Sequence, residues 1–374
     1  MGNFRSSVTR TFGLLTAGGD CPGLNAAIRG VCRAASSRYN MKVIGIADGF
    51  RGLIEGNYRE LSPDDFTGIL TRGGTILGAS REKPFKQEPP SGSAENRLYS
   101  GDIENEKVEA IKDNYRKLGL DCLVVLGGNG THTIGYRLTW EGLNVIGLPK
   151  TIDNDIVGTD RSFGFNSALA VATDAIDRLH STAQSHSRVI VVELMGHKAG
   201  WLALYAGIAG GGDVIIIPEI PYDIKSIARH LEERANSGRR FSIVVVAEGA
   251  LSVEESNMDK KERKKFRSET VIPSIAYRIA SEIETETGME TRATVLGYMQ
   301  RGGVPSATDR LLATSLGTAA AELLARGRFG RMVALAGNEM TSVDLSVPAE
   351  KVKTVPREHY MIDTALSVGT CLGE

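Results

Sequence analysis

The sequence predicts an α/β protein made of two doubly wound, mainly parallel-sheet domains. Short apolar runs alternate with longer helical patterns along the chain. The runs are uninterrupted, as in strands that are buried on both faces of a sheet. The length of 374 residues also exceeds the size at which a single hydrophobic core stops growing. We therefore expect an active site in the cleft between the two domains, a common position for small-molecule sites.

Uninterrupted apolar runs mark the predicted strands, which we place at residues 12–15, 43–46, 123–126, 145–148, 189–192, 214–217 and 243–246. Helical patterns lie between them, at residues 25–37, 106–118, 167–185, 224–237 and 268–287. Because strand and helix alternate, right-handed crossovers should join neighbouring parallel strands. Two polar stretches, 83–105 and 254–267, are predicted to be solvated loops or insertions that carry no chemistry.

The overall charge is close to neutral, which excludes several classes of partner. The formal net charge is −1, with 24% charged residues. The chain therefore lacks the excess positive charge that is typical of proteins that bind nucleic acid or an anionic membrane. Four cysteines lie far apart without a CxxC pair and are predicted to be reduced thiols. The apolar stretch at 12–15 is broken at Gly18, so we expect no signal peptide or membrane span and a cytoplasmic location.

A glycine-rich loop follows the first predicted strand. It contains Gly18, Gly19 and Gly23 and leads into an apolar helical segment at 26–35. Glycines let backbone N–H groups approach an anion closely, and a helix N-terminus adds a favourable dipole. The arrangement predicts a phosphate site, although a tight turn without a ligand would use the same glycines. No Gly-Lys-Ser or Gly-Lys-Thr follows, so the loop is not a Walker A motif.

A second loop of the same construction, residues 127–133, follows the strand that ends at Leu126. It includes Gly127, Gly128 and Gly130. If both strands belong to one parallel sheet, the two loops converge at its carboxyl edge, where open α/β sheets bind ligands. This convergence favours a phosphate-binding role over a purely structural one.

Two carboxylates, Asp153 and Asp155, follow the strand predicted at 145–148. At this spacing one can accept a hydroxyl proton while the other helps to hold a metal that bridges phosphates. Lys150 could add a positive charge and Thr151 a hydroxyl donor, both of which suit phosphoryl transfer. On spacing alone, the same aspartates could merely cap a turn or the next helix.

Five segments together resemble the phosphofructokinase family, in the family's own order. They are residues 15–30, 72–81 (RGGTILGASR), 149–155 (PKTIDND), 195–197 (MGH) and 290–303 (ETRATVLGYMQRGG). With their flanks they span about residue 11 to residue 324. The resemblance implies Mg²⁺-dependent transfer of a phosphoryl group to the 1-hydroxyl of fructose 6-phosphate.

The resemblance assigns roles in the chemical step. Asp153 would be the general base for the sugar hydroxyl, and Asp155 would help to coordinate Mg²⁺. Thr151 would lie beside the transferred phosphoryl group, with Arg81 stabilising its growing charge and Lys150 also in the catalytic set. Contacts with the nucleotide or its phosphates are implied at Gly19, Arg81, Lys86, Asn129, Gly130 and Thr131.

The resemblance also implies a sugar-phosphate site. Its residues would be Thr151, Asp153, Met195, Gly196, His197, Glu248, Tyr298 and Arg301. Arg188 and Arg292 match the pair that reaches the 6-phosphate from a neighbouring subunit, and the planar fork of arginine suits phosphate. We therefore expect a homodimer or homotetramer. Residues 1–164 with 302–345 would form the phosphoryl-donor domain, and 165–301 with 346–374 the sugar-phosphate domain.

The sequence departs from the family pattern at some of these positions. Asn129 stands where an aspartate is usual, so as a metal ligand it offers only an amide oxygen, and Asp155 or Asp20 would carry more of the cation. His197 stands where an arginine is usual.

Two residues bear on the identity of the phosphoryl donor, and they favour different donors. Gly130 resembles the ATP-using branch, because an aspartate there would repel an α-phosphate, whereas Lys150 resembles the pyrophosphate-using branch. The steric argument favours ATP and leaves the pyrophosphate-dependent enzyme as the alternative.

Three rival functions are weaker. An NAD kinase or lipid kinase relative would share the second glycine loop but not the ordered segments around Asp153, Met195 and Arg292. A dinucleotide-dependent oxidoreductase would need a GxGxxG after the first strand, with an acidic residue about 20 positions on. A catalytically silent sugar-phosphate sensor is suggested by Asn129 but disfavoured by Asp153 beside an intact Arg81.

Overall fold

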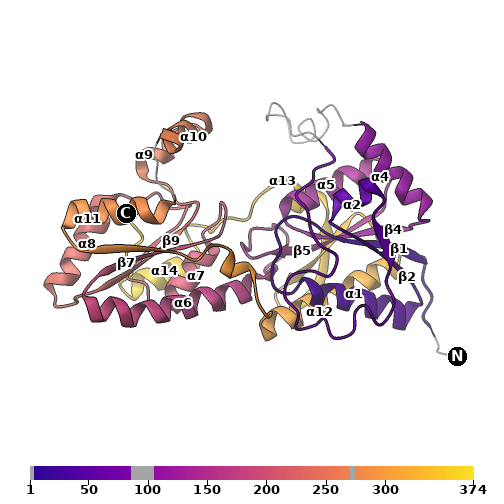
Figure 1. The fold of residues 1–374 in the computed structure, drawn as a ribbon, viewed down its shortest axis with the longest axis horizontal. Helices are drawn as coiled ribbons and strands as arrows, with labels where there is room; N and C mark the ends of the chain where they lie inside the picture. Colours follow the sequence, from indigo (N-terminus) through magenta and orange to yellow (C-terminus); the bar gives the residue numbers. More distant parts are fainter. Residues whose placement is uncertain (1–3, 86–104, 270–273) are drawn as a thin grey trace. The chain divides into compact units, whose positions relative to one another are not determined.

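Uninterrupted apolar runs form the buried strands of two separate sheets, as the sequence predicts. The computed structural model describes residues 4–85, 105–269 and 274–374. Contacts between residues divide the chain into two compact units (Figure 1). Unit 1 comprises Met1–Thr151, Ile156–Ser167 and Arg301–Val352, and unit 2 comprises Ile152–Asp155, Ala168–Gln300 and Lys353–Glu374.

Unit 1 is built on an eight-stranded sheet with the order β12-β11-β5-β4-β1-β2-β3, to which β6 adds beside β5. The strands are β1 (Thr11–Thr16), β2 (Lys42–Ile46), β3 (Tyr58–Glu60), β4 (Cys122–Gly127), β5 (Val145–Thr151), β6 (Phe163–Gly164), β11 (Arg331–Ala336) and β12 (Glu339–Asp344). The central pairs are parallel, and only β3 and β12 run antiparallel to their neighbours. The predicted α/β class with mainly parallel sheets is confirmed.

Helices cover both faces of this sheet (Figure 1). On one face lie α1 (Leu24–Tyr39) and α12 (Ala307–Ala325), and on the other lie α2 (Phe50–Glu55), α4 (Asn105–Lys117), α5 (Asn129–Trp140) and α13 (Ser346–Glu350). The helices α1 and α12 approach each other closely at Gly30, where a Cβ atom would lie 2.9 Å from the carbonyl oxygen of Thr314. This contact fixes α1, and with it the first glycine loop, against the sheet.

Unit 2 has a four-stranded parallel sheet with the order β10-β7-β9-β8. The strands are β7 (Val189–Leu194), β8 (Val214–Ile216), β9 (Ser242–Ala247) and β10 (Thr291–Val295). The flanking helices are α6 (Phe165–His186), α7 (Trp201–Ala209), α8 (Ile224–Asn236), α11 (Ile275–Thr287) and α14 (Tyr360–Ser367). Apolar residues of α8 and α11 pack with the strands in one buried core.

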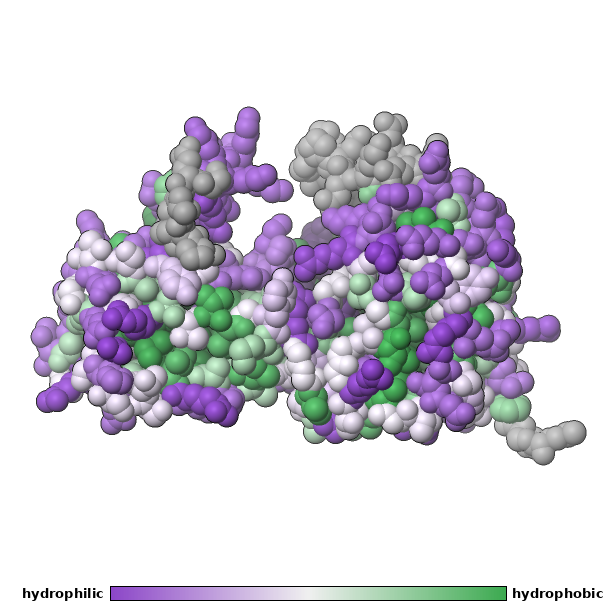
Figure 2. Space-filling view, in the orientation of Figure 1, coloured by the Kyte–Doolittle hydropathy of each residue, from purple (hydrophilic) through white to green (hydrophobic). Residues whose placement is uncertain are grey.

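The charged stretch at 254–267 is not a loop, as the sequence suggested, but largely helical. It contains α9 (Val253–Ser256) and α10 (Lys260–Glu269), and its surface is almost entirely hydrophilic (Figures 1 and 2). The helix predicted at 268–287 is also shorter than expected, because α11 begins at Ile275. Lysine, arginine and glutamate are good helix formers, so a dense charge run does not by itself predict a loop.

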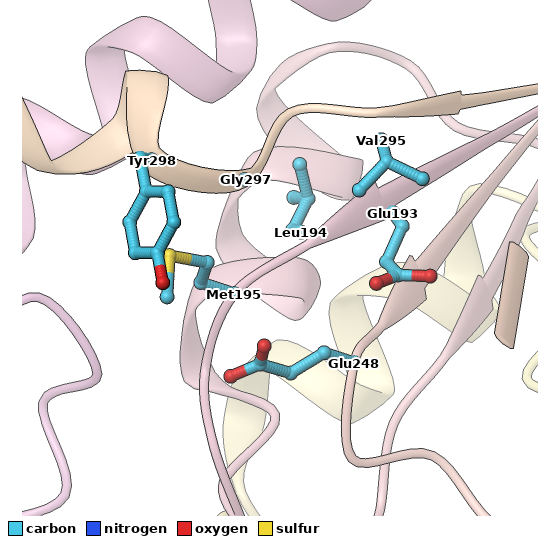
Figure 3. Close-up of a pocket in the computed structure, with 7 residues that line it drawn as sticks. All are labelled: Glu193, Leu194, Met195, Glu248, Val295, Gly297 and Tyr298. Atoms are coloured by element: carbon cyan, nitrogen blue, oxygen red, sulfur yellow. The ribbon is translucent and has the colours of Figure 1, made fainter. Parts of the chain in front are cut away.

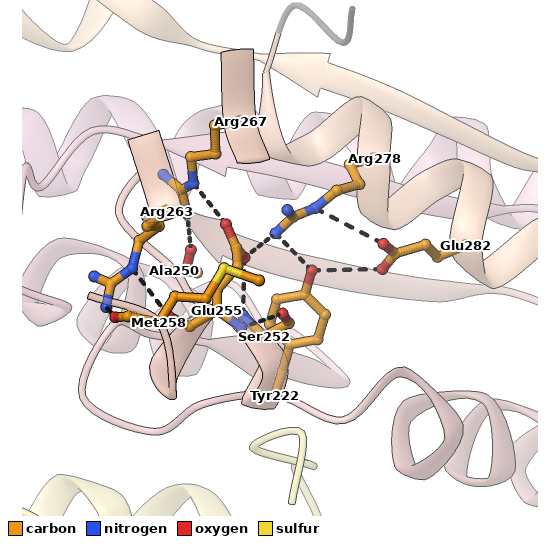
Figure 4. Close-up of polar contacts among 9 residues, drawn as sticks. All are labelled: Tyr222, Ala250, Ser252, Glu255, Met258, Arg263, Arg267, Arg278 and Glu282. Carbon is orange, nitrogen blue, oxygen red and sulfur yellow. Dashed lines mark hydrogen bonds and ion pairs between the residues drawn. The ribbon is translucent and has the colours of Figure 1, made fainter. Parts of the chain in front are cut away.

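One buried carboxylate connects this helical excursion, the segment that contains α9 and α10, to α11 of unit 2. The side chain of Glu255 is fully buried and accepts hydrogen bonds from Arg267 (2.6 Å) and Arg278 (2.5 Å) (Figure 4). Its backbone and carboxylate also form a capping box with Ser252 at the start of α9. Arg278 in turn donates to the hydroxyl of Tyr222, so α9, α10 and α11 share one polar network.

Two further expectations concern the redox state of the cysteines and membrane spans. All four cysteines are free, three of them buried, as expected for reduced thiols. Within the described ranges, no helix has the length and apolar character needed to cross a membrane.

Candidate active site

The two glycine loops follow neighbouring strands of unit 1. The strands β1 and β4 pair in parallel with Thr16 opposite Leu126, so both loops leave the same edge of the sheet, as the sequence predicted. The chain continues from β1 to β2 on one side, whereas β4 and β5 lie on the other. This reversal of strand order is the point at which open α/β sheets bind ligands outside their carboxyl ends.

The first glycine loop is shaped by close approaches that a side chain would block. Gly18 has a φ of 80°, and its N–H donates to the carbonyl of Ser80 (2.9 Å). A Cβ atom on Gly19 would lie 1.9 Å from the guanidinium of Arg301, which donates to the Asp20 carbonyl. The ammonium of Lys150 donates to the carbonyl of Gly19. Two cations from distant parts of the chain thus converge on this loop.

The second glycine loop turns directly into α5, which begins at Asn129. The buried Thr131 packs against Gly127, where a Cβ atom would collide with the threonine side chain. Behind the loop, a ring nitrogen of the buried His132 lies 2.9 Å from the Gly128 carbonyl oxygen. Burial lowers the pKa of His132 to about 4, so the imidazole is neutral at pH 7. The loop is held from within and does not need a ligand to set its shape.

Gly130 faces open space. Within the described part of the chain, a Cβ atom at this position would meet no heavy atom within 4 Å, and the residue is exposed. Its φ is not in the left-handed region that would demand glycine. The chain's own packing therefore leaves this position free to accept a larger residue.

The segment that contains Arg81 lies next to the first loop, through the bond from Gly18 to Ser80. Arg81 itself is exposed. Thr151, at the end of β5, is buried, and its carbonyl accepts a hydrogen bond from Ser162 (2.9 Å). Lys86, a predicted phosphate contact, lies outside the described residues, as does most of the stretch predicted to be a loop at 83–105.

The predicted catalytic carboxylates, Asp153 and Asp155, belong to unit 2. Asn154 between them has a φ of 53°, a left-handed conformation that asparagine tolerates better than most residues. Burial, and then the neighbouring charge of Asp153, raise the pKa of Asp155 to about 6. A buried carboxylate whose pKa is raised in this way is a candidate for a functional site.

This carboxylate pair fits a divalent cation of the Mg²⁺ type. Mg²⁺ takes oxygen ligands and is usually bound by one or two carboxylates together with substrate phosphates. No cluster of three or more acidic, histidine or cysteine ligands occurs among residues 4–85, 105–269 and 274–374, so the phosphates would have to complete the coordination. Burial raises the pKa of Asp155 first and the neighbouring charge of Asp153 second, and a bound cation would offset the charge that both of them disfavour.

A small pocket of about 180 Å³ opens at the carboxyl edge of the unit 2 sheet (Figure 3). Met195 follows β7, Glu248 follows β9 and Tyr298 follows β10, and all three line the pocket. Glu248 accepts hydrogen bonds from the N–H groups of Gly196 (3.3 Å) and His197 (2.8 Å). The structure thus brings together five of the ten residues that the resemblance assigns to the sugar phosphate, namely Met195, Gly196, His197, Glu248 and Tyr298.

Arg188 and Arg292 lie at the opposite edge of the same sheet. Arg188 immediately precedes β7, and Arg292 is the second residue of β10, which pairs with β7 in parallel. Both guanidinium groups contact the carboxylate of Glu290, at 2.7 Å and 2.5 Å. The six residues of β7 separate Arg188 from Met195, a distance of about 20 Å along the strand. Within one chain, these arginines do not reach the pocket.

Some residues that shape the site were not found from the sequence. Asn25 is fully buried and anchors the 72–76 segment, because its side-chain amide donates to the carbonyls of Arg72 and Gly73 and its oxygen accepts from Ile76. Glu193 lines the pocket and accepts from the N–H of Ala276, in the first turn of α11. A polar residue at the start of a helix was the one available signal for Asn25, and no local pattern marks Glu193.

Comparison with known proteins places these features in context. The model of a family described as Phosphofructokinase matches residues 11–324. An ATP-dependent 6-phosphofructokinase of Spirochaeta thermophila is 65% identical over 366 residues, which cover 98% of each chain.

Solved structures show the same fold. A phosphofructokinase of Saccharomyces cerevisiae is 29% identical, with a TM-score of 0.72, and matches 96% of this chain but only 47% of the yeast chain. A pyrophosphate-dependent phosphofructokinase of Marinobacter aquaeolei has a TM-score of 0.76 and 92% of its chain covered. Because it is only 21% identical, this second likeness bears on the fold alone.

Proposed function

The chain belongs to the phosphofructokinase family, and from this premise we propose that it is an ATP-dependent 6-phosphofructokinase of glycolysis. The observation that carries the proposal is the 65% identity, along almost the whole of both chains, to a relative with that name. The enzyme is a phosphotransferase with an alcohol acceptor. It transfers the terminal phosphoryl group of ATP to the 1-hydroxyl of fructose 6-phosphate and forms fructose 1,6-bisphosphate and ADP.

In this proposal Asp153 accepts the proton of the 1-hydroxyl as its oxygen attacks the terminal phosphorus, and the bond to ADP breaks. Arg81, Lys150 and Thr151 stabilise the charge on the transferred group, which is where most of the catalysis in such reactions arises. Asp155 would hold Mg²⁺, with Asn129 as a second ligand. When it is bound, Mg²⁺ neutralises charge on the phosphate oxygens. The two cations at the first glycine loop, Lys150 and Arg301, support a polyanionic ligand there.

The remaining assignments divide the substrates between the domains. Gly19, Arg81, Lys86, Asn129, Gly130 and Thr131 of the predicted donor domain contact ATP. Met195, Gly196, His197, Glu248, Tyr298 and Arg301 contact the sugar phosphate. The pocket lined by Met195, Glu248 and Tyr298 supports the second set. We also propose a cytoplasmic location, which cell fractionation would test.

The donor choice rests on Gly130. The space around this glycine supports ATP, because no heavy atom of the described residues lies within 4 Å of the position that its Cβ atom would take. The same space makes Gly130→Asp a clean test, since the aspartate would not strain the fold. The variant should lose activity with ATP by at least about tenfold through charge repulsion and keep or gain activity with pyrophosphate. Unchanged use of ATP would contradict the steric argument.

The active enzyme is proposed to be a homodimer or homotetramer, in which Arg188 and Arg292 complete a neighbour's sugar site. Their position at the far edge of the unit 2 sheet supports this, since they cannot reach the pocket of their own chain. Light scattering should find an oligomer. Arg292→Ala should raise the KM for fructose 6-phosphate about tenfold or more while the oligomer persists. A fully active monomer would rule out the arrangement.

The decisive assay offers the purified protein Mg²⁺ and fructose 6-phosphate with either ATP or pyrophosphate. We expect fructose 1,6-bisphosphate with ATP and much slower formation with pyrophosphate. Faster turnover with pyrophosphate would select the alternative donor, and no turnover with either would contradict the proposed function.

A further inference from the structure

A lysine near the C-terminus contacts the carboxylate loop of unit 2. The backbone N–H of Lys353 donates to the carbonyl of Asp155 (2.8 Å). Its ammonium lies 3.4 Å from the side-chain oxygen of Asn154. One residue, about two hundred positions further along the chain, therefore contacts both Asn154 and Asp155. No motif that we identified in the sequence includes it.

The loop needs such support because its conformation is strained. Asn154 adopts a left-handed φ of 53°, which costs a residue other than glycine about 1 kcal/mol or more. This turn lies between Asp153 and Asp155 in the chain. A strained residue persists only where its surroundings determine it strongly, and the hydrogen bond to Lys353 is one such determinant.

Lys353 and the residues that follow it also contact buried residues of unit 2 outside the carboxylate loop. Its carbonyl accepts the indole N–H of Trp201 (2.9 Å), and its ammonium lies 5.6 Å from the centre of the indole ring. Two residues further on, the N–H of Val355 donates to Glu219 (2.8 Å), which also accepts the N–H of Gly200 at the start of α7. Trp201 and Val355 are both buried. The segment that holds the loop is thus itself fixed on both sides.

The positive charge of Lys353 also favours its position beside the carboxylate loop. The loop places two carboxylates two residues apart, and the ammonium of Lys353 partly offsets them, as does the exposed His197. The long, flexible stem of lysine allows this cation to remain near the loop while the backbone of residue 353 is fixed. An arginine could keep the charge, whereas a methionine would keep only the length and volume of the stem.

We propose that Lys353 is a positioning residue for the reaction: it holds the loop that bears Asp153 and Asp155 in its productive conformation. It acts through Asn154 and Asp155 and not on the substrates. The inference rests on the proposed function, because it supposes that Asp153 is the base. Since a displacement of about 1 Å in a reacting group can cost 10²-fold in rate, a misplaced loop should lower kcat more than it weakens binding.

The kinetic test compares Lys353→Met with Lys353→Arg in the full-length protein. Lys353→Met should lower kcat by about 10- to 100-fold and leave the KM values for ATP and fructose 6-phosphate within about threefold. Lys353→Arg should recover most of the loss. A wild-type kcat in Lys353→Met, or an equal loss in both variants, would overturn the role of the ammonium. Wild-type protein without turnover would instead mark the failure of the proposed function.

A spectroscopic test does not depend on turnover. In a Trp140→Phe background, Trp201 is the remaining tryptophan and its emission responds to the cation beside its ring. Lys353→Met should shift this emission. Asn154→Gly keeps the left-handed turn but removes the ammonium's partner, so it should shift the emission in the same direction. If Lys353→Met shifts the emission and Asn154→Gly does not, Asn154 does not hold Lys353 and the proposal fails. Unchanged emission in Lys353→Met would show that the ammonium does not lie beside the ring, which would also overturn the proposal.

Discussion

Unit 2 contains two buried carboxylates whose pKa values are shifted in opposite directions by their surroundings. Glu255 accepts hydrogen bonds from Arg267 and Arg278, and although burial alone would raise its pKa, these bonds lower it to about 2. Asp155 is also buried, but its close neighbour Asp153 is another acid, and its pKa rises to about 6. Burial works in the same direction at both sites, so the partners decide the outcome.

This difference distinguishes a carboxylate that holds the fold from one that serves ligands. The chain itself balances the charge of Glu255, and the result is a fixed junction between α9, α10 and α11 (Figure 4). Asp155 is buried beside a second acid, Asp153, so its charge costs stability, and a raised pKa of this kind is typical of a group that serves a ligand. Removing each charge should therefore have opposite effects on stability.

The largest expected effect is on turnover. Asp153→Asn should lower kcat by at least about 10²-fold, the usual scale for removal of a general base, and leave the thermal unfolding midpoint unchanged or slightly higher. Steady-state kinetics with a thermal melt would measure both. Asp177→Asn, at an exposed position of α6, is the matched control and should behave as wild type. A fully active Asp153→Asn enzyme would contradict the role of Asp153 as the general base.

The next largest effect is on stability at the Glu255 network. Glu255→Ala leaves Arg267 and Arg278 without their shared carboxylate and should lower the free energy of unfolding by about 3–5 kcal/mol. Chemical denaturation would measure this loss. Glu254→Ala, at the exposed neighbouring position, should change stability by less than about 0.5 kcal/mol. Equal effects of the two variants would mean that burial of Glu255 does not matter.

Glu255 and Asp155 should also make the stability of the fold depend on pH in opposite directions. The pKa of Glu255 is about 2 in the fold against an ordinary 4.5, so its stabilisation is complete above about pH 4.5 and is lost as the pH falls toward 2. The pKa of Asp155 is raised from 3.8 to about 6, so its protonated form stabilises the fold and that contribution is lost as the pH rises from about 4 to above 6.

Asp155→Asn should consequently stabilise the metal-free protein by about 1–3 kcal/mol at pH 7 and have almost no effect at pH 4. Denaturation at the two pH values would measure the difference. A variant that is less stable than wild type at pH 7 would show that Asp155 is compensated after all.

The smallest predicted effect concerns the cap of α9. The hydroxyl of Ser252 accepts the N–H of Glu255, and Ser252→Ala should cost about 1 kcal/mol of stability with no change in KM for either substrate. Thermal unfolding followed by circular dichroism would detect it. A change in KM without a change in stability would link the helical excursion to the sugar site instead.

Much of the fold could be predicted because parallel strands are buried on both faces. The runs around Val124 and Val191 are apolar throughout, and both became central strands. The glycine loops were predictable for a related reason: glycine marks backbone that must turn sharply or be approached closely, as at Gly18 and Gly19.

The rest depended on partners that are distant in the sequence. The Ser-x-x-Glu spacing of Ser252 and Glu255 is a local signature of a helix start, and the dense charge run was interpreted as a loop in spite of it. The burial of Glu255 beside the exposed Glu254 depends on arginines that are distant in the sequence. Lys353 meets Asn154 across about two hundred residues, and no local motif announces such a pair. The roles of the individual site residues remain predictions that the variants above would test.

The placement of Arg188 and Arg292 at one edge of the unit 2 sheet, with Met195 at the other, has a genetic consequence. If each catalytic centre uses arginines from a second polypeptide, two impaired alleles could complement each other. A mixed assembly of Asp153→Asn chains and Arg292→Ala chains would contain some centres with both lesions and some with neither. Co-expression of the two impaired variants would then restore a fraction of the growth on sugar.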